Sequence, residues 1–291
     1  MKFSFKNIQH DLLSPGNIFW KKNSGDAVLI SKKGEALNLD LLKKFFDSGK
    51  EIYLEDGIDI HVHFEMKALY DKYSEEILMR DKIQWRDKLI AIFRKEFIEK
   101  ENVVQFELDQ LAWKLFSNLE LPEGLIFIER DADLFRRHLS VASSYTYCAF
   151  LLGYYEPAFL NRLFSKTLQN LMELGASARI LTLKEKLEYL RLQESFSSED
   201  YEYLKTIASD EILARTVMFE KYDGSGPRNL NSKEMSDLEV VFVAINSLFG
   251  FTNDNQENIF NSIIKGDLNC GTRTLKMLQK ILSEKEIEKE M

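Results

Sequence analysis

The chain has 291 residues, 45% hydrophobic and 30% charged, with a formal net charge of −8 at pH 7. An acidic chain of this kind lacks the basic face that nucleic-acid binding requires, and no apolar run approaches the roughly 18 residues of a transmembrane helix. Its two cysteines, Cys148 and Cys270, are too far apart for a CxxC site, and the N-terminus lacks the apolar core of a secretory signal. We therefore expect a cytoplasmic globular protein that binds neither nucleic acid nor membrane.

Residues 1–64 are predicted to form a small α+β module. Short apolar runs between turn residues predict strands at residues 2–6, 17–21, 27–31 and 52–55. One amphipathic helix is predicted over Leu39–Asp47, and Gly49 stands where a C-terminal cap is expected.

His61 and His63 close this module. Their alternation predicts that both imidazoles lie on one face of a strand, where they could form a metal pair. Asp56, Asp59 and Glu65 are close enough in sequence to contribute ligands. Because no third ligand is obvious, we favour a surface or interface pair.

Residues 65–122 are predicted to be a helical linker. Leu69, Tyr70, Tyr73, Ile77 and Leu78 recur at three-and-four spacing, and neither glycine nor proline occurs between residues 57 and 122. Two interpretations stay open. The helices link a sensory module to an output domain or form a homodimer seam, or they pack as a hairpin on the domain that follows.

Residues 123–291 are predicted to be a multi-helix bundle. The apolar periodicity predicts helices over residues 136–154, 157–175, 183–192, 198–208, 211–219, 236–251, 256–265 and 272–285. The fold class is thus mainly α, with a C-terminal bundle preceded by the α+β module and the linker helices.

A glycine- and proline-rich stretch interrupts this bundle. Two glycines two residues apart, followed directly by a proline, predict a sharp turn that cannot continue a helix. With the adjoining arginine the stretch comprises Glu220, Lys221, Tyr222, Asp223, Gly224, Ser225, Gly226, Pro227 and Arg228. With its flanks, residues 216–252, it resembles the HD-GYP domain of bacterial cyclic-di-GMP phosphodiesterases. Their signature is Asp-Gly-Ser-Gly-Tyr-Pro, and the tyrosine is missing here.

The resemblance implies an HD-GYP-like helical domain, but the ligands of that family's metal centre are largely lost. Hydrolysis in the family uses two or three metal ions held by histidines and aspartates. The family's positions correspond to His138, Met172-Glu173, Ile207-Ala208, Met218-Phe219 and Asn246, so that His138, Glu173 and Asn246 are vestiges. Ala176 takes the place of a substrate-contacting lysine. The chain has four histidines, and none follows His138.

One histidine, one glutamate and one asparagine cannot hold a binuclear centre. We therefore predict a degenerate pseudoenzyme with no metal, no cofactor and no catalytic residues. Met172, Ile207, Met218 and Phe219 replace polar ligands by apolar bulk, which avoids leaving buried polar groups unpaired.

Three functions are consistent with such a protein. The first is a regulatory or scaffolding module in cyclic-di-GMP signalling, because the loop from Glu220 to Arg228 is polar and the resemblance implies a protein partner such as a GGDEF-type domain. The second is a metal-independent sensor that binds cyclic-di-GMP through Lys221 and Arg228. The third, which we rank last, is a divergent active phosphodiesterase. Scaffolding predicts an exposed apolar patch or an oligomer seam on the linker helices.

Overall fold

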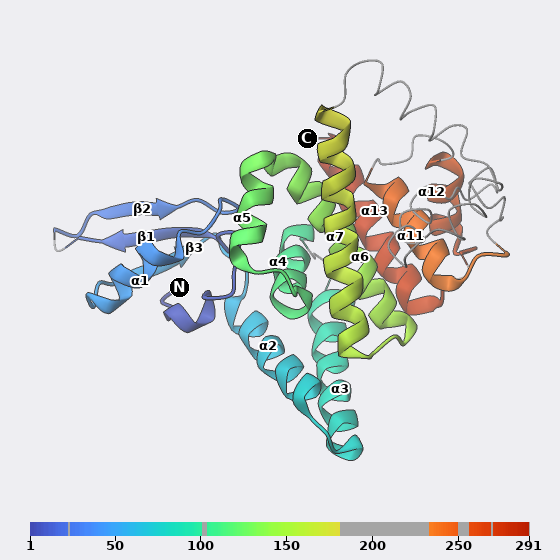
Figure 1. Ribbon diagram of the computed structural model, residues 1–291, viewed down its shortest axis with the longest axis horizontal. Helices are drawn as coiled ribbons and strands as arrows, with labels where there is room; N and C mark the ends of the chain where they lie inside the picture. Colours follow the sequence, from blue (N-terminus) through green and yellow to red (C-terminus); the bar gives the residue numbers. More distant parts are fainter. Residues whose placement is uncertain (23, 101–103, 181–232, 250–255, 269, 291) are drawn as a thin grey trace. The chain divides into compact units, whose positions relative to one another are not determined.

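The computed structural model describes residues 1–22, 24–100, 104–180, 233–249, 256–268 and 270–290 (Figure 1). Most of these residues are helical, and one three-stranded sheet lies near the N-terminus. The predicted mainly α class is therefore confirmed. The chain divides into two compact units: an N-terminal unit of Met1–Phe135 with Tyr155–Ser165, and a C-terminal unit of Arg136–Tyr154 with Lys166–Met291.

The sheet has the strand order β2-β1-β3 and is antiparallel throughout. Its strands are β1 (Asn17–Lys21), β2 (Ala27–Ser31) and β3 (Ile52–Glu55), with the predicted bounds. Ile18 lies opposite Leu54, and both side chains are buried. The central strand β1 thus presents its apolar face to the core of the module.

Helix α1 (Leu39–Asp47) also has the predicted bounds. The Leu41 amide donates to the Asn38 side chain at 2.9 Å, which satisfies one of the first free N–H groups. Gly49 follows the helix with a φ of +67°, a backbone conformation that favours glycine.

The strand predicted at residues 2–6 is wrong. Lys2 makes one isolated bridge with Tyr53, and Phe5–Asn7 form a short 3-10 helix, η1. The cause is local, because the Asn7 side chain accepts hydrogen bonds from the Ser4 amide at 3.0 Å and the Ser4 hydroxyl at 2.7 Å. A side chain that bonds to nearby backbone in this way closes a turn in place of an extended strand.

The sheet, η1 and α1 share one apolar core. The most deeply buried members are Ile8, Ile18, Leu42, Ile52, Leu54, Ile58 and Ile60. All are aliphatic residues, and they come from several short elements and turns, so the core forms only when these elements have come together.

Four further helices belong to the N-terminal unit: α2 (Ile60–Glu75), α3 (Met79–Phe93), α4 (Gln105–Phe116) and α5 (Leu121–Arg130). Helix α3 continues into a π-helical turn, η2 (Arg94–Ile98). The predicted boundary between residues 64 and 65 falls inside α2, which begins at the last member of the module core.

Helix α4 is tied to the N-terminal module by buried polar contacts. The Lys114 ammonium lies 2.8 Å from an Asp11 carboxylate oxygen, an ion pair without hydrogen-bond geometry, and both side chains are buried. The same ammonium donates to the Asn7 carbonyl at 2.9 Å. Gln110, one turn earlier, donates to the Leu13 carbonyl at 2.9 Å. Two backbone carbonyls of the module are thus satisfied from α4.

The remaining helices are α6 (Ala132–Leu152), α7 (Pro157–Ile180), α11 (Asp237–Leu248), α12 (Gln256–Lys265) and α13 (Thr272–Glu290). Helix α11 begins with a capping box in which Ser236 and Glu239 bond each other's backbone amides. Residues 240–248 of this helix are all buried, as expected of the central helix of a bundle. The helices predicted at 183–192, 198–208 and 211–219 lie outside the described residues. None of the described helices combines the length and the apolar character needed to cross a membrane.

Candidate functional site

The loop from Glu220 to Arg228 lies outside the described residues, as do residues 207–208 and 218–219. The positions of His138, Met172 and Asn246 are described, all in the C-terminal unit, on α6, α7 and α11. Glu173 is on α7, and its side chain lies outside the described part.

His138 and Met172 are in direct contact. The His138 Nδ1 atom lies 3.3 Å from the Met172 sulfur, and both side chains are buried. A thioether therefore occupies the space beside the imidazole in which a second metal ligand would have to lie. Met172 is the residue that the resemblance places at a lost histidine.

These residues do not fit a binuclear metal centre. Asn246 is buried, and its carbonyl oxygen finds no hydrogen-bond partner among the described residues. Within the same described ranges, no group of three or more His, Cys, Asp or Glu side chains is arranged to hold a metal ion. Iron and manganese need several imidazole and carboxylate ligands, whereas His138 has a sulfur atom as its neighbour.

His61 and His63 do not lie on a strand, and this prediction is wrong. Both are in the first turn of α2, where His61 is exposed and His63 is buried. Residues two apart on a helix point to different sides, so the two imidazoles do not form a pair. Asp59, considered as a metal ligand, is the N-cap and accepts from the amides of His61 at 3.0 Å and Val62 at 3.3 Å.

Neither the hydroxyl of Ser143 nor the thiol of Cys148, both on α6, is set up to act as a nucleophile. The Ser143 hydroxyl donates to the Leu139 carbonyl one turn earlier, at 2.7 Å. Cys148 is buried, and burial raises the pKa of its thiol well above the usual range. A buried cysteine that stays protonated is a poor nucleophile.

A polar pocket lies within the N-terminal unit, between α2, α4 and the first residues of α7. It encloses about 320 Å³. Its lining residues are His10, Lys67, Tyr70, Asp71, Ser74, Trp113, Lys114, Leu115, Ser117, Asn118, Leu119 and Asn161. Hydrogen-bonding side chains thus outnumber apolar ones, and ammonium, carboxylate, imidazole, hydroxyl and carboxamide groups all occur.

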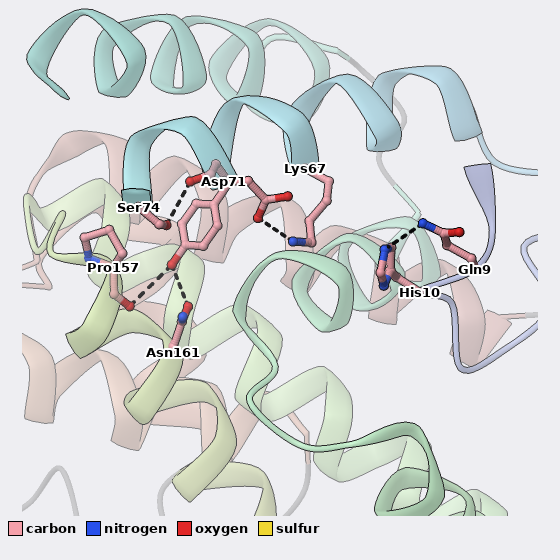
Figure 2. A network of polar contacts seen from close by, with 8 residues as sticks. Gln9, His10, Lys67, Asp71, Ser74, Pro157 and Asn161 are labelled. Atoms are coloured by element: carbon pink, nitrogen blue, oxygen red, sulfur yellow. Dashed lines mark hydrogen bonds and ion pairs between the residues drawn. The ribbon is translucent and has the colours of Figure 1, made fainter. Parts of the chain in front are cut away.

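Figure 2 shows how these groups are held. Lys67 and Asp71 form an ion pair one turn apart on α2. The Tyr70 hydroxyl donates to the Asn161 side chain at 2.6 Å, and the Ser74 hydroxyl donates to the Tyr70 carbonyl at 2.8 Å. Tyr70 therefore fixes the start of α7 against α2, while Lys67 and Asp71 form the neighbouring stretch of the pocket wall.

His10 lies at the other side of this network, next to Gln9, with 3.1 Å between the two side-chain nitrogens (Figure 2). The pKa of His10 is lowered, first by partial burial and then by the positive charges of Lys67 and Lys114, and Asp71 opposes this only in part. Positive charge thus prevails at the imidazole.

No sequence motif predicts this pocket. Its residues come from the turn after η1, from α2, from α4 with the turn that follows it, and from α7. These segments are far apart in the sequence and share no recognisable pattern. The available signal was the spacing of Lys67 and Asp71, which are i and i+4 on one helix face.

A second feature of the N-terminal unit is an exposed apolar turn between α2 and α3. Ile77 is 93% exposed, Leu78 65% and Met79 70%. We call these three residues the apolar turn. The turn lies at the end of the helical hairpin of α2 and α3 (Figure 1).

No protein-family model and no curated protein matches this chain. Among solved structures, the chain is similar to Bd1817, an HDGYP protein from Bdellovibrio bacteriovorus. The two share 13% sequence identity over 98% of this chain and 99% of that one, with a TM-score of 0.35. A similarity at this level does not show a shared fold or a shared activity.

Proposed function

We propose that this chain is a regulatory protein-interaction module in cyclic-di-GMP signalling, without the metal-dependent hydrolysis of the HD-GYP domains that its sequence resembles. The loss of hydrolysis is supported by the contact of His138 with Met172 and by the absence of any histidine from the sequence after His138. The link to cyclic-di-GMP signalling rests on the sequence resemblance over residues 216–252.

The observation that carries the interaction role is the apolar turn. Burying one large apolar side chain in an interface contributes roughly 1.5–3 kcal/mol to the free energy of binding. The three residues of the apolar turn are mostly exposed and therefore available for such burial. Contiguous apolar surface of this kind marks an interaction site. An exposed apolar patch on the linker helices is also what the scaffolding function predicts.

The charges around the apolar turn favour a protein partner over a lipid surface. Between residues 75 and 82 there are three acidic side chains, Glu75, Glu76 and Asp81, against two basic ones, Arg80 and Lys82. Anionic membranes attract polybasic segments, which this is not. Three side chains are too few for a complete interface of roughly 800 Å² per partner. The apolar turn is better suited to anchor in an apolar groove, with α2 and α3 forming the polar rim.

The test is a binding titration with the GGDEF-domain proteins encoded in the same genome, with Leu78→Ser as the variant. We expect one of them to bind the wild type and the variant to weaken that binding by about thirtyfold, the effect of removing one hot-spot side chain. Ile264→Ser, at an exposed isoleucine of α12, is the matched control and should bind like the wild type.

Two outcomes contradict the proposal. Equal binding of the wild type and Leu78→Ser would remove the apolar turn as the contact site, and no GGDEF-domain binding at all would remove the proposed partner class. A parallel titration with cyclic-di-GMP alone tests the sensor, because micromolar binding without any protein partner would favour that function.

A further inference from the structure

The polar pocket is not used by the proposed function. It lies within the N-terminal unit, whereas the residues compared with the metal centre lie in the C-terminal unit and the apolar turn is a surface feature. Its volume of about 320 Å³ is at the lower end of the roughly 300–1,000 Å³ that ligand sites enclose. An occupant would therefore be a small molecule.

The charges of the lining favour an anionic group. Two ammonium groups, Lys67 and Lys114, line the pocket against one carboxylate, Asp71. Lys114 is buried and paired with Asp11, and its charge still acts on the His10 imidazole. Lys67 is the cation that can reach an occupant, because its side chain is only partly buried and its ion pair with Asp71 faces the pocket (Figure 2).

His10 supplies a second group for the same anion. His10 is an exposed residue whose imidazole is partly buried in the positive field of Lys67 and Lys114, so an anion placed between His10 and Lys67 would relieve repulsion as well as accept hydrogen bonds. Asp71, which is about half exposed, would lose its partner to the anion and retain contact with water. The exchange of one anion for another at Lys67 leaves no buried charge unpaired.

The rest of the lining suits an uncharged polar body. Asn118 and Asn161 bring two carboxamides to the wall, and Ser74 brings a hydroxyl. Asn161 is oriented by the Tyr70 hydroxyl, which donates to its carbonyl oxygen and leaves its amide hydrogens for other acceptors. The amide of such an asparagine presents donors at a fixed position.

We propose that the polar pocket binds a small polar organic anion, with one carboxylate or phosphate group between His10 and Lys67 and its hydroxyl or carbonyl groups against Asn118 and Asn161. This makes the N-terminal unit a small-molecule sensing unit, independent of the partner contact at the apolar turn.

The experiment is a titration of the full chain, followed through the nitrogen NMR signals of the histidine side chains. Three probes separate the two anion classes: inorganic phosphate, glycerol 3-phosphate and succinate. We expect a saturable shift of the His10 signals in the millimolar range or below, caused by a phosphate-bearing or a carboxylate-bearing probe. The bound anion should raise the pKa of His10, so that binding tightens as the pH falls through the titration of that imidazole. Besides His10, the charged groups that affect this pH dependence are Lys67 and Asp71 of α2 and Lys114 of α4.

Variants distinguish a site from general charge attraction. Lys67→Met should weaken binding by about tenfold, the effect of losing one charge-assisted hydrogen bond, and Lys67→Arg should restore most of it. Lys43→Met removes one exposed lysine of α1 and should bind like the wild type. His10→Gln, at an exposed position, should abolish the tightening at low pH even if Lys67→Met folds poorly.

The proposal is overturned if none of the three probes gives a saturable shift of the His10 signals. It is also overturned if Lys67→Met and Lys43→Met bind the active probe equally, because the attraction would then be unspecific. Failure of GGDEF-domain binding leaves this result unaffected, since neither the probes nor the variants involve the apolar turn.

Discussion

At the scale of single residues, the buried ion pair of Asp11 and Lys114 is the least ordinary feature of the N-terminal unit. Removing two charges from water is costly, and a buried pair is weak support for stability even when its geometry is good. Here burial raises the pKa of Asp11 to about 6, although Lys114 acts in the opposite direction. Desolvation therefore outweighs the attraction between the two charges.

This shift gives a first prediction. The folded state binds the Asp11 proton more tightly than the unfolded state does, because the pKa is about 6 against a usual 3.8. The contribution of this group to the free energy of unfolding is fully present below about pH 3.8. It is lost as the pH rises to about 6, and the loss is roughly 3 kcal/mol. Urea unfolding across this range should show the wild type losing stability relative to Asp11→Asn. Asp47→Asn, at an exposed aspartate of α1, is the control, and an Asp11→Asn curve parallel to the wild type would contradict the assignment.

His63 gives the opposite pH dependence. Burial, with Lys114 and Lys100 as further causes, lowers its pKa well below the usual 6.5. The unfolded state therefore takes up a proton more readily, and stability present above about pH 6.5 is lost as the pH falls below it. His63→Leu should remove this acid loss in the same unfolding measurements. His61→Leu, at an exposed position of the same helix turn, controls for the loss of a histidine. The prediction fails if both variants retain the wild-type loss between about pH 6.5 and 5.

At the scale of elements, the segments that could be predicted are those whose signals are local. β1, β2, β3 and α1 have the predicted bounds because apolar runs of strand length are separated by turn residues, and because Gly49 marks the end of α1. The 3-10 helix η1 could not be predicted from apolar pattern alone, since it depends on the hydrogen bonds between Ser4 and Asn7.

The error at His61 and His63 has a different cause. Three residues are too few to distinguish alternation on a strand from two sides of a helix. The signal that resolves them is Asp59, a good N-cap residue directly before an apolar periodic run. Because Asp59 was considered as a metal ligand and not as an N-cap, the start of α2 was not predicted.

Gly49 provides the third prediction. Its φ of +67° is unfavourable for residues with a Cβ atom, and an added Cβ would meet nothing within 4 Å. Gly49→Ala should therefore destabilise the protein by about 1–2 kcal/mol through the backbone alone, measured as a shift of the denaturant midpoint. Gly49→Asn should lose less, because asparagine tolerates this conformation. Equal losses for both variants would contradict the assignment of the effect to the positive φ of this residue.

At the scale of the whole molecule, the candidate sites could be predicted only where the chain resembles a known pattern. The contact of His138 with Met172 follows from positions that the resemblance had already singled out. The polar pocket depends on the packing of α2, α4 and α7, and no residue in it is unusual for its own segment. Sites of that kind appear only when distant segments have been placed together.

The fourth prediction concerns metal. Because His138 faces a sulfur atom and no histidine follows it in the chain, prolonged treatment with a chelator should leave the thermal unfolding midpoint unchanged. Elemental analysis of the purified protein should find far less than one iron or manganese per chain. Near-stoichiometric metal, or a midpoint that falls on chelation and recovers on adding metal, would contradict the loss of the centre.

The hydrogen bonds from α4 to the N-terminal module also set an order of events during synthesis on the ribosome. Lys114 bonds to Asn7 across 107 positions, and Gln110 bonds to Leu13 across 97. At a synthesis rate of 5–20 residues per second, the donors Lys114 and Gln110 are made roughly 5–20 s after the carbonyls of Asn7 and Leu13. The nascent N-terminal module is therefore without these hydrogen bonds for that time, which is when a chaperone would have most to bind.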